Sequence, residues 1–501
     1  MDFVVYLLRI LFFLVSLCGT AVGARHFLHM FQLNSYKPNV QRRWLNENQR
    51  QALLLWLPAA GGFLFWPKAA KVPLKMTSRA KRLVAAYALL TVLWYALAWR
   101  FAFPLGLEFF FFWIWQSNAP YVLLAANWLN RPIEAAVRRH YTGEAVRKLR
   151  SHPSLIVIGI TGSYGKTSVK HYLNTLLRAK YNVLITPGGV NTPMGVVRCV
   201  REELSAAHEI FLCEMGAKNR GDIKELCDLV QPQHGILTAV GPQHLESFGA
   251  IETIIATKFE LADALPPHGT LFANIDSEPI AKTIGSYPNT ITYSAGSAGS
   301  YHAKDRSVNE NGTSFTFVTP QGDQERFTSR LIGAHNIVNL VGAAAAAHAL
   351  GVPLEQLKGQ MRKIAPVPHR LELIDRGDVL VIDDGYNSNP AGAKAALDTL
   401  ALFEGLKILV TPGMIELGAR QAQLNYIFGL QAAAVCDVIA LIGPALTKPI
   451  YDGAIEGGFP PEQIIVANAL PEAIAQVNAL SAPRKVILLE NDLPDNFDTV
   501  R

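Results

Sequence analysis

The stretch GITGSYGKTSVK, residues 159–170, constrains the fold of this 501-residue chain more than any other. It follows the apolar run LIVIGI, which predicts a buried strand over 155–160, and it leads into 167–179, which predicts a helix. Two glycines let the loop curl so that its backbone N–H groups face a phosphate, while a lysine and a threonine supply a cation and a magnesium-binding hydroxyl. The loop reads G-x-x-G-K-T, shorter than the common phosphate-binding form, so a chance loop at a strand–helix junction is the alternative.

Two stretches that follow carry polar side chains toward the same predicted sheet edge. The Gly-rich run 186–200 places Asn191 and Thr192 before a helix. The run 209–217 predicts a strand that ends in Glu214. Because carboxylates at strand ends beside a phosphate-binding loop commonly hold a metal ion, this edge is a candidate cation site.

A histidine and a lysine further along are weaker candidates. The run 235–249 is predicted as another strand that delivers His244 to the same edge, and the predicted helix 251–265 carries Lys258. Taken singly, His244 is equally well an ordinary loop histidine and Lys258 a solvated helix lysine. Their context decides between these interpretations.

The spaced runs TGSYGKTS, TPGGVNTPMG, EMGA, HLESFG and KFE resemble the central domain of the Mur ligase family. Members of this family are ATP-dependent amide ligases of cell-wall synthesis, and the motifs are most similar to those of members that add D-alanyl-D-alanine to a UDP-muramoyl tripeptide. The resemblance covers residues 155–501. It implies ATP and two Mg²⁺ ions as cofactors, and an acyl-phosphate formed on a carboxylate acceptor.

Carried over position by position, the resemblance implies roles for the catalytic residues. Lys166 is expected to bind the β- and γ-phosphates, and Thr167 the first Mg²⁺. Glu214 and His244 match ligands of the second Mg²⁺. Lys258 matches a lysine that is carbamylated in several members, and as a carbamate it becomes a further metal ligand. The chemistry fits, because a carbamate is an anion that can bridge a dication, whereas a free ammonium is repelled.

A wider set of residues is expected to contact ATP or substrate. The run AHNIVN resembles the family's H-N-x-x-N helix start near adenine, and an arginine and an aspartate further along grip ATP when the last domain closes. The expected ATP-binding residues are Thr161, Gly162, Ser163, Tyr164, Gly165, Lys166, Thr167, Ser168, Asn336, Arg370 and Asp384. The residues expected to contact substrate are Asn191, Thr192, Tyr386, Asn387 and Asn389.

From about residue 377 the chain alternates apolar runs with helical ones. VLVIDD, KILVTPG, VIALIG, QIIVA and KVILLEND predict strands, and AGAKAALDTLALF and PEAIAQVNAL predict helices between them. This order predicts a Rossmann-like, doubly wound sheet. Two departures from the family are Gly392, where a helix-capping serine is usual, and the acidic end 488–498, where a basic strand end is usual.

The amino-terminal part is apolar and basic. Residues 1–150 hold 19 Lys/Arg and 5 Asp/Glu, a net charge of +14, and the remainder carries −8. A basic apolar region suits a membrane with anionic lipids, and an acidic remainder argues against nucleic acid as a partner. The five cysteines have no metal-binding spacing and indicate a reducing compartment. The family's own amino-terminal domain, which holds the UDP-sugar, is replaced by these apolar segments.

Several segments are candidates for membrane spans. Residues 3–24 are long enough to cross a hydrocarbon core, which takes about 20 residues, and Arg9 within them must snorkel or pair. Residues 83–129 are almost continuously apolar and predict two spans that turn near 104–108. The polar residues 116–118 are interpreted as helix–helix hydrogen bonding, with a lipid-headgroup site as the alternative.

Flanking charge sets the expected topology. The run 52–66 is too short for a straight span and has basic residues on both sides, so a re-entrant or interfacial segment is expected. This predicts three spans with the amino terminus outside, and four spans with the terminus inside is the alternative. Both place residue 131 onward in the cytoplasm. A cleaved signal peptide is disfavoured because two more apolar segments follow.

The predicted fold class is α/β preceded by transmembrane helices. The expected regions are a membrane region over 1–130, a basic surface helix or linker over 131–153, an ATP-binding Mur-type central domain over 154–366, and a Rossmann-like domain over 367–501.

The predicted function is a membrane-anchored, ATP-dependent amide ligase of the bacterial cell envelope, multi-pass, with its catalytic domains on the cytoplasmic side. Its expected partners are an amino acid or short peptide that donates the amine, a lipid-linked or UDP-linked cell-wall precursor, and membrane lipids. A catalytically inactive scaffold and a P-loop ATPase coupled to transport are the alternatives.

Overall fold

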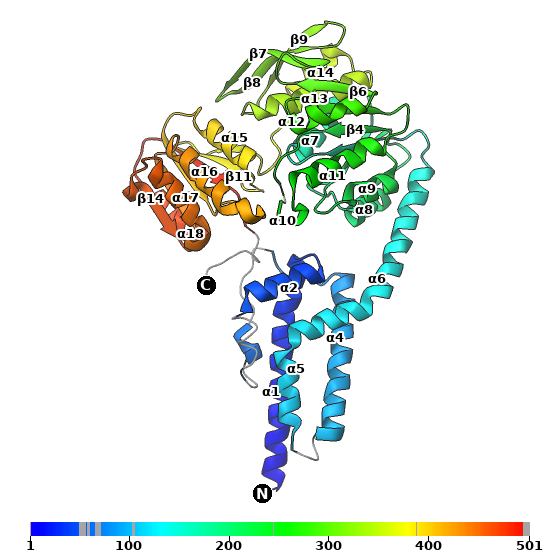
Figure 1. Cartoon of the computed structure of the whole chain (residues 1–501), viewed down its shortest axis with the longest axis vertical. Helices are drawn as coiled ribbons and strands as arrows, with labels where there is room; N and C mark the ends of the chain where they lie inside the picture. Colours follow the sequence, from blue (N-terminus) through cyan, green and yellow to red (C-terminus); the bar gives the residue numbers. More distant parts are fainter. Residues whose placement is uncertain are drawn as a thin grey trace. The chain divides into compact units, whose positions relative to one another are not determined.

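The computed structural model describes residues 2–49, 57, 61–65, 72–102, 106–243, 245–386 and 388–493. The expected site residues His244 and Asn387 therefore lie outside the described residues. The chain divides into two compact units, one reaching to His140 and the other running from Tyr141 to Asp492 (Figure 1).

The described part of the first unit is helical. Its elements are α1 (Asp2–Leu33), α2 (Pro38–Glu47), the 3₁₀ turn η1 (Gly61–Phe65), α4 (Ser78–Leu97), the π turn η2 (Ala98–Ala102), α5 (Glu108–Ser117) and the beginning of α6 (Ala119–Arg150). Phe27, Phe31 and Trp44 belong to the buried cluster that joins them. Within the described residues, Phe3–Leu33 and Ser78–Ala102 are long and apolar enough to cross a membrane, by length and composition.

Two predictions about the apolar region agree with the helices. The break expected near 104–108 agrees with the described helices, because the π turn ends at Ala102 and α5 begins at Glu108, but the span expected after it is divided at Asn118 into α5 and α6. Arg9 of α1 pairs with the buried carboxylate of Glu108, so the charge inside the apolar helix has a partner. Most of 52–66 lies outside the described residues, and its described part, Gly61–Phe65, is the 3₁₀ turn.

The polar residues 116–118 lie at the end of α5 and bond to backbone carbonyls. Ser117 donates to the carbonyl of Trp113 and Asn118 to that of Ile114, both at 2.8 Å. Gln116 donates to the carbonyl of Leu57 at 3.2 Å. These bonds favour a structural role for residues 116–118, in ending the helix and in packing, over a role in binding a lipid headgroup.

Helix α6 differs from its prediction. The last apolar span and the basic surface helix were expected as separate elements, with a boundary near residue 130. The structure has one continuous helix, Ala119–Arg150, with Pro132 inside it. Its last turns, from Tyr141 onward, belong to the second unit, where Tyr141, Ala145 and Leu149 join a hydrophobic cluster.

The second unit begins with a nine-stranded sheet in the order β2-β3-β1-β4-β5-β6-β7-β8-β9. The strands up to β7 pair in parallel, and β8 and β9 return antiparallel. The strands are β1 (Ile156–Thr161), β2 (Val183–Ile185), β3 (Ile210–Glu214), β4 (His234–Leu237), β5 (Thr270–Asn274), β6 (Thr290–Ser294), β7 (Tyr301–Asn309), β8 (Gly312–Val318) and β9 (Gln324–Ser329).

Helices cover this sheet, which explains why its parallel strands are apolar on both faces. They are α7 (Lys166–Leu177), α8 (Pro193–Glu203), α9 (Asp222–Val230), α10 (Leu245–Phe248), α11 (Ile251–Asp263), α12 (Glu278–Thr283), α13 (His335–Ala349) and α14 (Leu354–Met361). The strands expected at 155–160 and 209–217 are confirmed. The strand expected over 235–249 is present as β4 but is much shorter than predicted, because β4 stops at Leu237 and a Gly-Pro step follows before α10.

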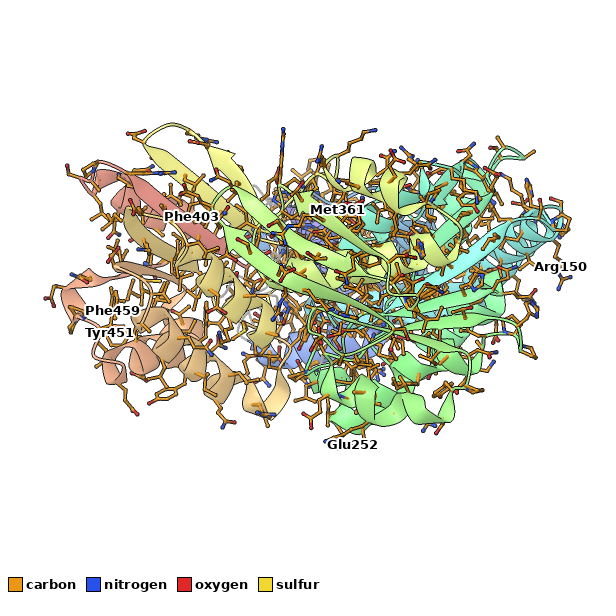
Figure 2. The ribbon with its side chains drawn as sticks, turned by 90° about the horizontal axis from the view of Figure 1, so that it is seen from above. Arg150, Glu252, Met361, Phe403, Tyr451 and Phe459 are labelled. Carbon is orange, nitrogen blue, oxygen red and sulfur yellow. The ribbon has the colours of Figure 1, made fainter. Side chains whose placement is uncertain are left out.

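The last domain is a six-stranded sheet in the order β10-β11-β15-β12-β13-β14. Its elements are β10 (Glu372–Asp375), β11 (Val379–Asp384), α15 (Pro390–Leu400), β12 (Leu406–Thr411), α16 (Gln421–Ala433), β13 (Val438–Ile442), α17 (Pro444–Glu456), β14 (Ile464–Ala467), α18 (Leu470–Ala479) and β15 (Lys485–Glu490). The five expected strands are confirmed, and the antiparallel edge strand β10 was not predicted. Phe403 and Phe459, labelled in Figure 2, belong to the core of this domain, and Met361 to that of the central domain.

Candidate active site

The loop between β1 and α7 depends on two glycines. Gly162 has φ +151° and Gly165 has φ +80°, values that other residues rarely adopt. A Cβ on Gly162 would lie 2.1 Å from Oγ1 of Thr238, and one on Gly165 would lie 2.6 Å from Oδ1 of Asn339. Backbone geometry and space therefore both require glycine, and the loop leads directly into the N-terminus of α7, where a phosphate binds well.

Two hydroxyls of the loop are used by the protein itself. Thr161 donates to the carbonyl of Met215 at 2.9 Å. Ser163 donates to the carbonyl of Gly241 at 3.0 Å and accepts from the N–H of the same residue at 3.1 Å. Both side chains are buried. These bonds fasten the loop to its neighbours, so Thr161 and Ser163 position the loop.

Lys166 is the first residue of α7, and its side chain folds back over the loop. Its Nζ donates to the carbonyls of Gly162 at 2.7 Å and Ser163 at 3.2 Å. Burial lowers the pKa of Lys166 to about 8, opposed by the carboxylate of Glu214 and reinforced by Arg370. Phosphate charge at this loop would favour the ammonium form, so the lysine is suited to bind a triphosphate.

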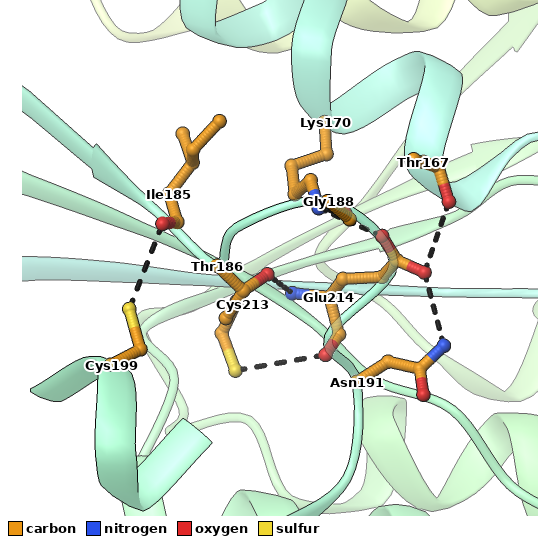
Figure 3. A network of polar contacts seen from close by, with 9 residues as sticks. All are labelled: Thr167, Lys170, Ile185, Thr186, Gly188, Asn191, Cys199, Cys213 and Glu214. Carbon is orange, nitrogen blue, oxygen red and sulfur yellow. Dashed lines mark hydrogen bonds and ion pairs between the residues drawn. The ribbon is translucent and has the colours of Figure 1, made fainter. Parts of the chain in front are cut away.

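Glu214, at the end of β3, is the centre of a buried polar network (Figure 3). Its Oε1 accepts from the hydroxyl of Thr167 at 3.1 Å and from Nδ2 of Asn191 at 3.1 Å. Its Oε2 accepts from Nζ of Lys170 at 2.9 Å. Thr167, expected to bind the first Mg²⁺, and Glu214, expected to bind the second, are therefore in direct contact, and Asn191 joins them.

Lys170 is a site residue that the sequence interpretation missed. Its side chain is fully buried, and its Nζ also donates to the carbonyl of Gly188 at 2.5 Å, which ties the Gly-rich loop to α7. The signal was available in GKTSVK, because Lys166 and Lys170 are four residues apart and so lie on the same helix face.

Lys258 lies in α11 and is only 3% exposed, so it is not a solvated helix lysine. Burial, with the nearby charge of Lys166, lowers the pKa of Lys258 well below its usual range. A lowered pKa enlarges the fraction of neutral amine, which is the form that reacts with carbon dioxide. The expected third partner, His244, lies outside the described residues.

A cavity of ≈ 300 Å³ connects the loop, Glu214, α13 and the last domain. Expected residues that line it are Ser163, Tyr164, Gly165, Lys166, Thr167, Ser168, Asn191, Glu214, Asn336, Arg370, Asp384, Tyr386 and Asn389. It also includes His335 and Asn339 of the H-N-x-x-N run, and Tyr172, Gln243 and Asn274, which were not singled out from the sequence. A wider hollow of ≈ 790 Å³ beside α9 and α11 shares none of these residues.

Asn336 lines this cavity, but its amide is held by the protein. Its Oδ1 accepts from the hydroxyl of Tyr172 at 2.8 Å, and its Nδ2 donates to the carbonyl of Ile332 at 2.7 Å. The neighbouring His335 also faces the cavity, and burial lowers its pKa to about 4, so its imidazole is neutral near pH 7.

The last domain contributes a basic and an acidic group. The guanidinium of Arg370 lies 4.4 Å from the ring centre of Tyr386. Asp384, at the end of β11, accepts from the N–H of Leu371 at 3.2 Å. Burial raises the pKa of Asp384 to about 6, against the opposing charge of Arg370. The strand end that departs from the family, Glu490, is buried opposite Asp384 in the adjacent strand.

The residues expected to contact substrate divide into two groups. Asn191, Tyr386 and Asn389 line the cavity. Asn389 also caps α15, because its Oδ1 accepts from the N–H of Gly392 at 2.9 Å, so the cap expected to be missing is supplied by an amide. Thr192 is the N-cap position of α8 and is not among the lining residues. Asn387 lies outside the described residues.

Sequence comparisons agree with this geometry. The Mur ligase middle domain matches residues 160–347, and the Mur ligase glutamate ligase domain matches 369–490. The UDP-N-acetylmuramoyl-tripeptide–D-alanyl-D-alanine ligase of Escherichia coli K12 is 30% identical over 356 residues, which cover 70% of this chain and 75% of that protein. The enzyme of the same name from Bacillus subtilis is 34% identical over 52% of this chain and 57% of its own length.

Solved structures show the same relationship. MurF from Acinetobacter baumannii superposes with a TM-score of 0.64 at 26% identity, covering 72% of this chain and 78% of that one. MurF from Thermotoga maritima, solved in complex with ADP, superposes with a TM-score of 0.63 at 26% identity over 71% and 80% of the two chains. The chain therefore belongs to the Mur ligase family and is an ATP-dependent, ADP-forming ligase that joins a carboxylate to an amine.

Proposed function

We propose that this chain is a membrane-attached ligase of peptidoglycan synthesis that joins a dipeptide amine to the stem-peptide carboxylate of a cell-wall precursor. The supporting observation is the convergence of Lys166, Thr167 and Glu214 in a cavity that Arg370 and Asp384 complete. The names of the relatives give D-alanyl-D-alanine and a UDP-N-acetylmuramoyl tripeptide as their reactants. A site that retains these groups also weighs against an inactive scaffold.

The proposed reaction has two steps. A carboxylate oxygen of the acceptor attacks the γ-phosphorus of ATP, the bond to the β–γ bridging oxygen breaks, and ADP leaves. The amine nitrogen then attacks the carbonyl carbon of the acyl-phosphate, and inorganic phosphate leaves as the amine loses a proton. Negative charge is redistributed over phosphoryl oxygens in both steps, so Lys166 and Arg370 serve as fixed positive groups.

The carboxylate of Glu214 and the hydroxyl of Thr167 are hard oxygen donors, which fit Mg²⁺. On the strength of the family resemblance, we assign Thr167 to the first magnesium ion and Glu214, together with His244, to the second. Bound magnesium supplies neutralisation of phosphate charge. Lys170 holds Oε2 of Glu214, whereas Oε1 contacts the hydroxyl of Thr167 and the amide of Asn191.

We propose that Lys258 is carbamylated in the active enzyme. Its neutral Nζ attacks carbon dioxide, an N–C bond forms, and one proton is released to leave a carbamate anion. The support is its 3% exposure and its lowered pKa. Once formed, the anion would offset the positive charge of Lys166 and provide oxygen donors near the cation site.

The first unit is proposed to lie in the membrane. Leu7, Leu11 and Leu14 on α1 are each about half exposed, as are Leu89 and Leu93 on α4. A continuous apolar surface of this kind is unfavourable in water and suits a hydrocarbon phase. We place the catalytic unit in the cytoplasm, where ATP is available, and propose that the acceptor is lipid-linked or UDP-linked.

The experiment is to incubate the full chain, in liposomes, with ATP, D-alanyl-D-alanine and either a UDP-linked or a lipid-linked muramoyl tripeptide. Mass spectrometry should find one acceptor lengthened by the dipeptide, and Lys166→Ala should give none. Lys224→Ala, which alters an exposed lysine of α9, is the matched control and should ligate normally. ATP hydrolysis without a lengthened product on either acceptor would contradict the proposal.

A further inference from the structure

Three side chains outside the nucleotide cavity converge at the start of the last domain. Strands β10 and β11 are antiparallel, and Glu372 lies directly opposite Asp383. Residues opposite each other in such a pair point to the same face of the sheet. His369, three residues before Glu372, lies over this pair with its Nδ1 2.7 Å from Oδ2 of Asp383. One imidazole nitrogen and two carboxylate oxygens therefore lie within 4.8 Å of one another.

Both carboxylates are already oriented by backbone N–H groups. Oδ1 of Asp383 accepts from the N–H of Gly385 at 3.0 Å, which leaves Oδ2 turned toward the imidazole. Oε2 of Glu372 accepts from the N–H of His369 at 3.1 Å. Ligating carboxylates in metal sites are held in the same way by hydrogen bonds from outside the coordination sphere.

The backbone at His369 is a second observation. Its φ is +58°, a left-handed value that a residue with a Cβ disfavours and that glycine adopts freely. In this conformation the imidazole contacts Asp383 and the backbone N–H of His369 contacts Glu372. Two like charges directly opposite on neighbouring strands repel each other, so a cation bound between them would relieve this repulsion.

We propose that His369, Glu372 and Asp383 bind a first-row divalent transition metal, of which Zn²⁺ is the probe. One nitrogen and two oxygen donors match the ligands of zinc and its neighbours, at bond lengths of about 2.0–2.2 Å. These three residues share no member with the magnesium ligands proposed at Thr167 and Glu214. The His369 side chain is 60% exposed, which gives water access to the remaining coordination positions.

The location gives the metal a structural consequence. The metal would join His369 and Glu372, which flank Arg370 and Leu371 in the chain, to Asp383 near the end of β11. Arg370 stacks on Tyr386, and the N–H of Leu371 donates to Asp384 at 3.2 Å. Metal binding would therefore stiffen the segment that presents Arg370 to the nucleotide cavity.

The test is equilibrium dialysis of the full-length, detergent-solubilised chain against Zn²⁺ in saturating Mg²⁺, with bound metal measured by mass spectrometry. The proposal predicts one bound Zn²⁺ that is lost in His369→Gly and in Asp383→Asn. His369→Gly is a clean variant, because glycine adopts the φ of this position without strain, and its thermal midpoint without zinc should not fall below that of the wild type.

Two controls locate the metal. His268→Ala, which alters an exposed histidine elsewhere, and Glu214→Gln, which alters the expected magnesium site, should both retain the ion. X-ray absorption at the zinc edge should report nitrogen and oxygen ligands and no sulfur. Zn²⁺ that is absent from the wild type, that persists in His369→Gly, or that is lost only in Glu214→Gln would overturn the proposal.

Discussion

Replacing Lys170 with methionine should destabilise the central domain by about 3–5 kcal/mol, because it leaves a buried carboxylate without its cation. The ion pair between Lys170 and Glu214 has side chains only 0% and 1% exposed, so water cannot take over the lost charge. Methionine has a similar shape, so the change tests charge and hydrogen bonding rather than volume. The bond from Lys170 to the Gly188 carbonyl is lost as well.

This destabilisation should be visible as a lower melting midpoint. At roughly 2–4 °C per kcal/mol for a domain of this size, the midpoint should fall by about 6–20 °C. All eight tryptophans lie in the first 128 residues, so their fluorescence follows the first unit, and hydrogen exchange of peptides covering 166–188 follows the central domain. Saturating Mg²⁺ should recover part of the loss, because a cation at Glu214 replaces the missing charge.

The matched control is Lys394→Met, which removes an exposed ion pair with Asp398 whose side chains are 57% and 63% exposed. Exposed pairs of this kind contribute about 0–1 kcal/mol, so its midpoint should hardly move. If the melting midpoint of Lys170→Met equals that of Lys394→Met and of the wild type, the Lys170–Glu214 pair does not stabilise the site and the reasoning is refuted.

Three further predictions concern the site. Lys258→Ala should lose ligation activity, and high bicarbonate should not restore it. Wild-type activity measured without carbon dioxide should fall as pH decreases through the lowered pKa of Lys258, since the neutral amine disappears. Full activity of the variant would remove Lys258 from the mechanism. Glu214→Gln should raise the Mg²⁺ requirement and slow turnover by about 10² or more in a magnesium titration, and an unchanged titration curve would exclude Glu214 as a ligand. The pKa of Asp384 is raised from 3.8 to about 6, so between these values the folded apo protein binds more protons than the unfolded chain, and its stability falls as pH rises through this window. Asp384→Asn should flatten that part of the stability profile measured by calorimetry, and a profile identical to the wild type would count against a buried, proton-binding Asp384.

The parts of the fold that are encoded by local patterns of apolar and polar residues were predictable. The run LIVIGI and the helix after it identified β1 and α7, and the regular alternation after residue 377 identified five strands of the last sheet. Strand β10 was not predicted because it has only four residues, too few to show a clear alternation of apolar and polar side chains. The sequence analysis predicted two elements where α6 is one helix. The side chains change from apolar to polar along its length, whereas the backbone stays helical throughout.

The partners of the site residues were harder to predict. Glu214 was expected from its strand end, but its contacts with Lys170 and Asn191 join residues 44 and 23 positions apart, which no local pattern reports. Thr161 and Ser163 match the loop motif, yet their hydroxyls bond to Met215 and Gly241. Such assignments depend on tertiary hydrogen bonding, which a motif does not encode.

The central claim is that an acceptor carboxylate is activated by phosphoryl transfer at the Lys166 loop. The most direct measurement uses a muramoyl tripeptide labelled with ¹⁸O in its terminal carboxylate, with ATP, D-alanyl-D-alanine and the full chain. Attack by the carboxylate oxygen on the γ-phosphorus predicts that the released phosphate carries one ¹⁸O, and that Lys166→Ala yields neither labelled phosphate nor product. Ligated product accompanied by unlabelled phosphate would contradict the acyl-phosphate route and the role assigned to the site.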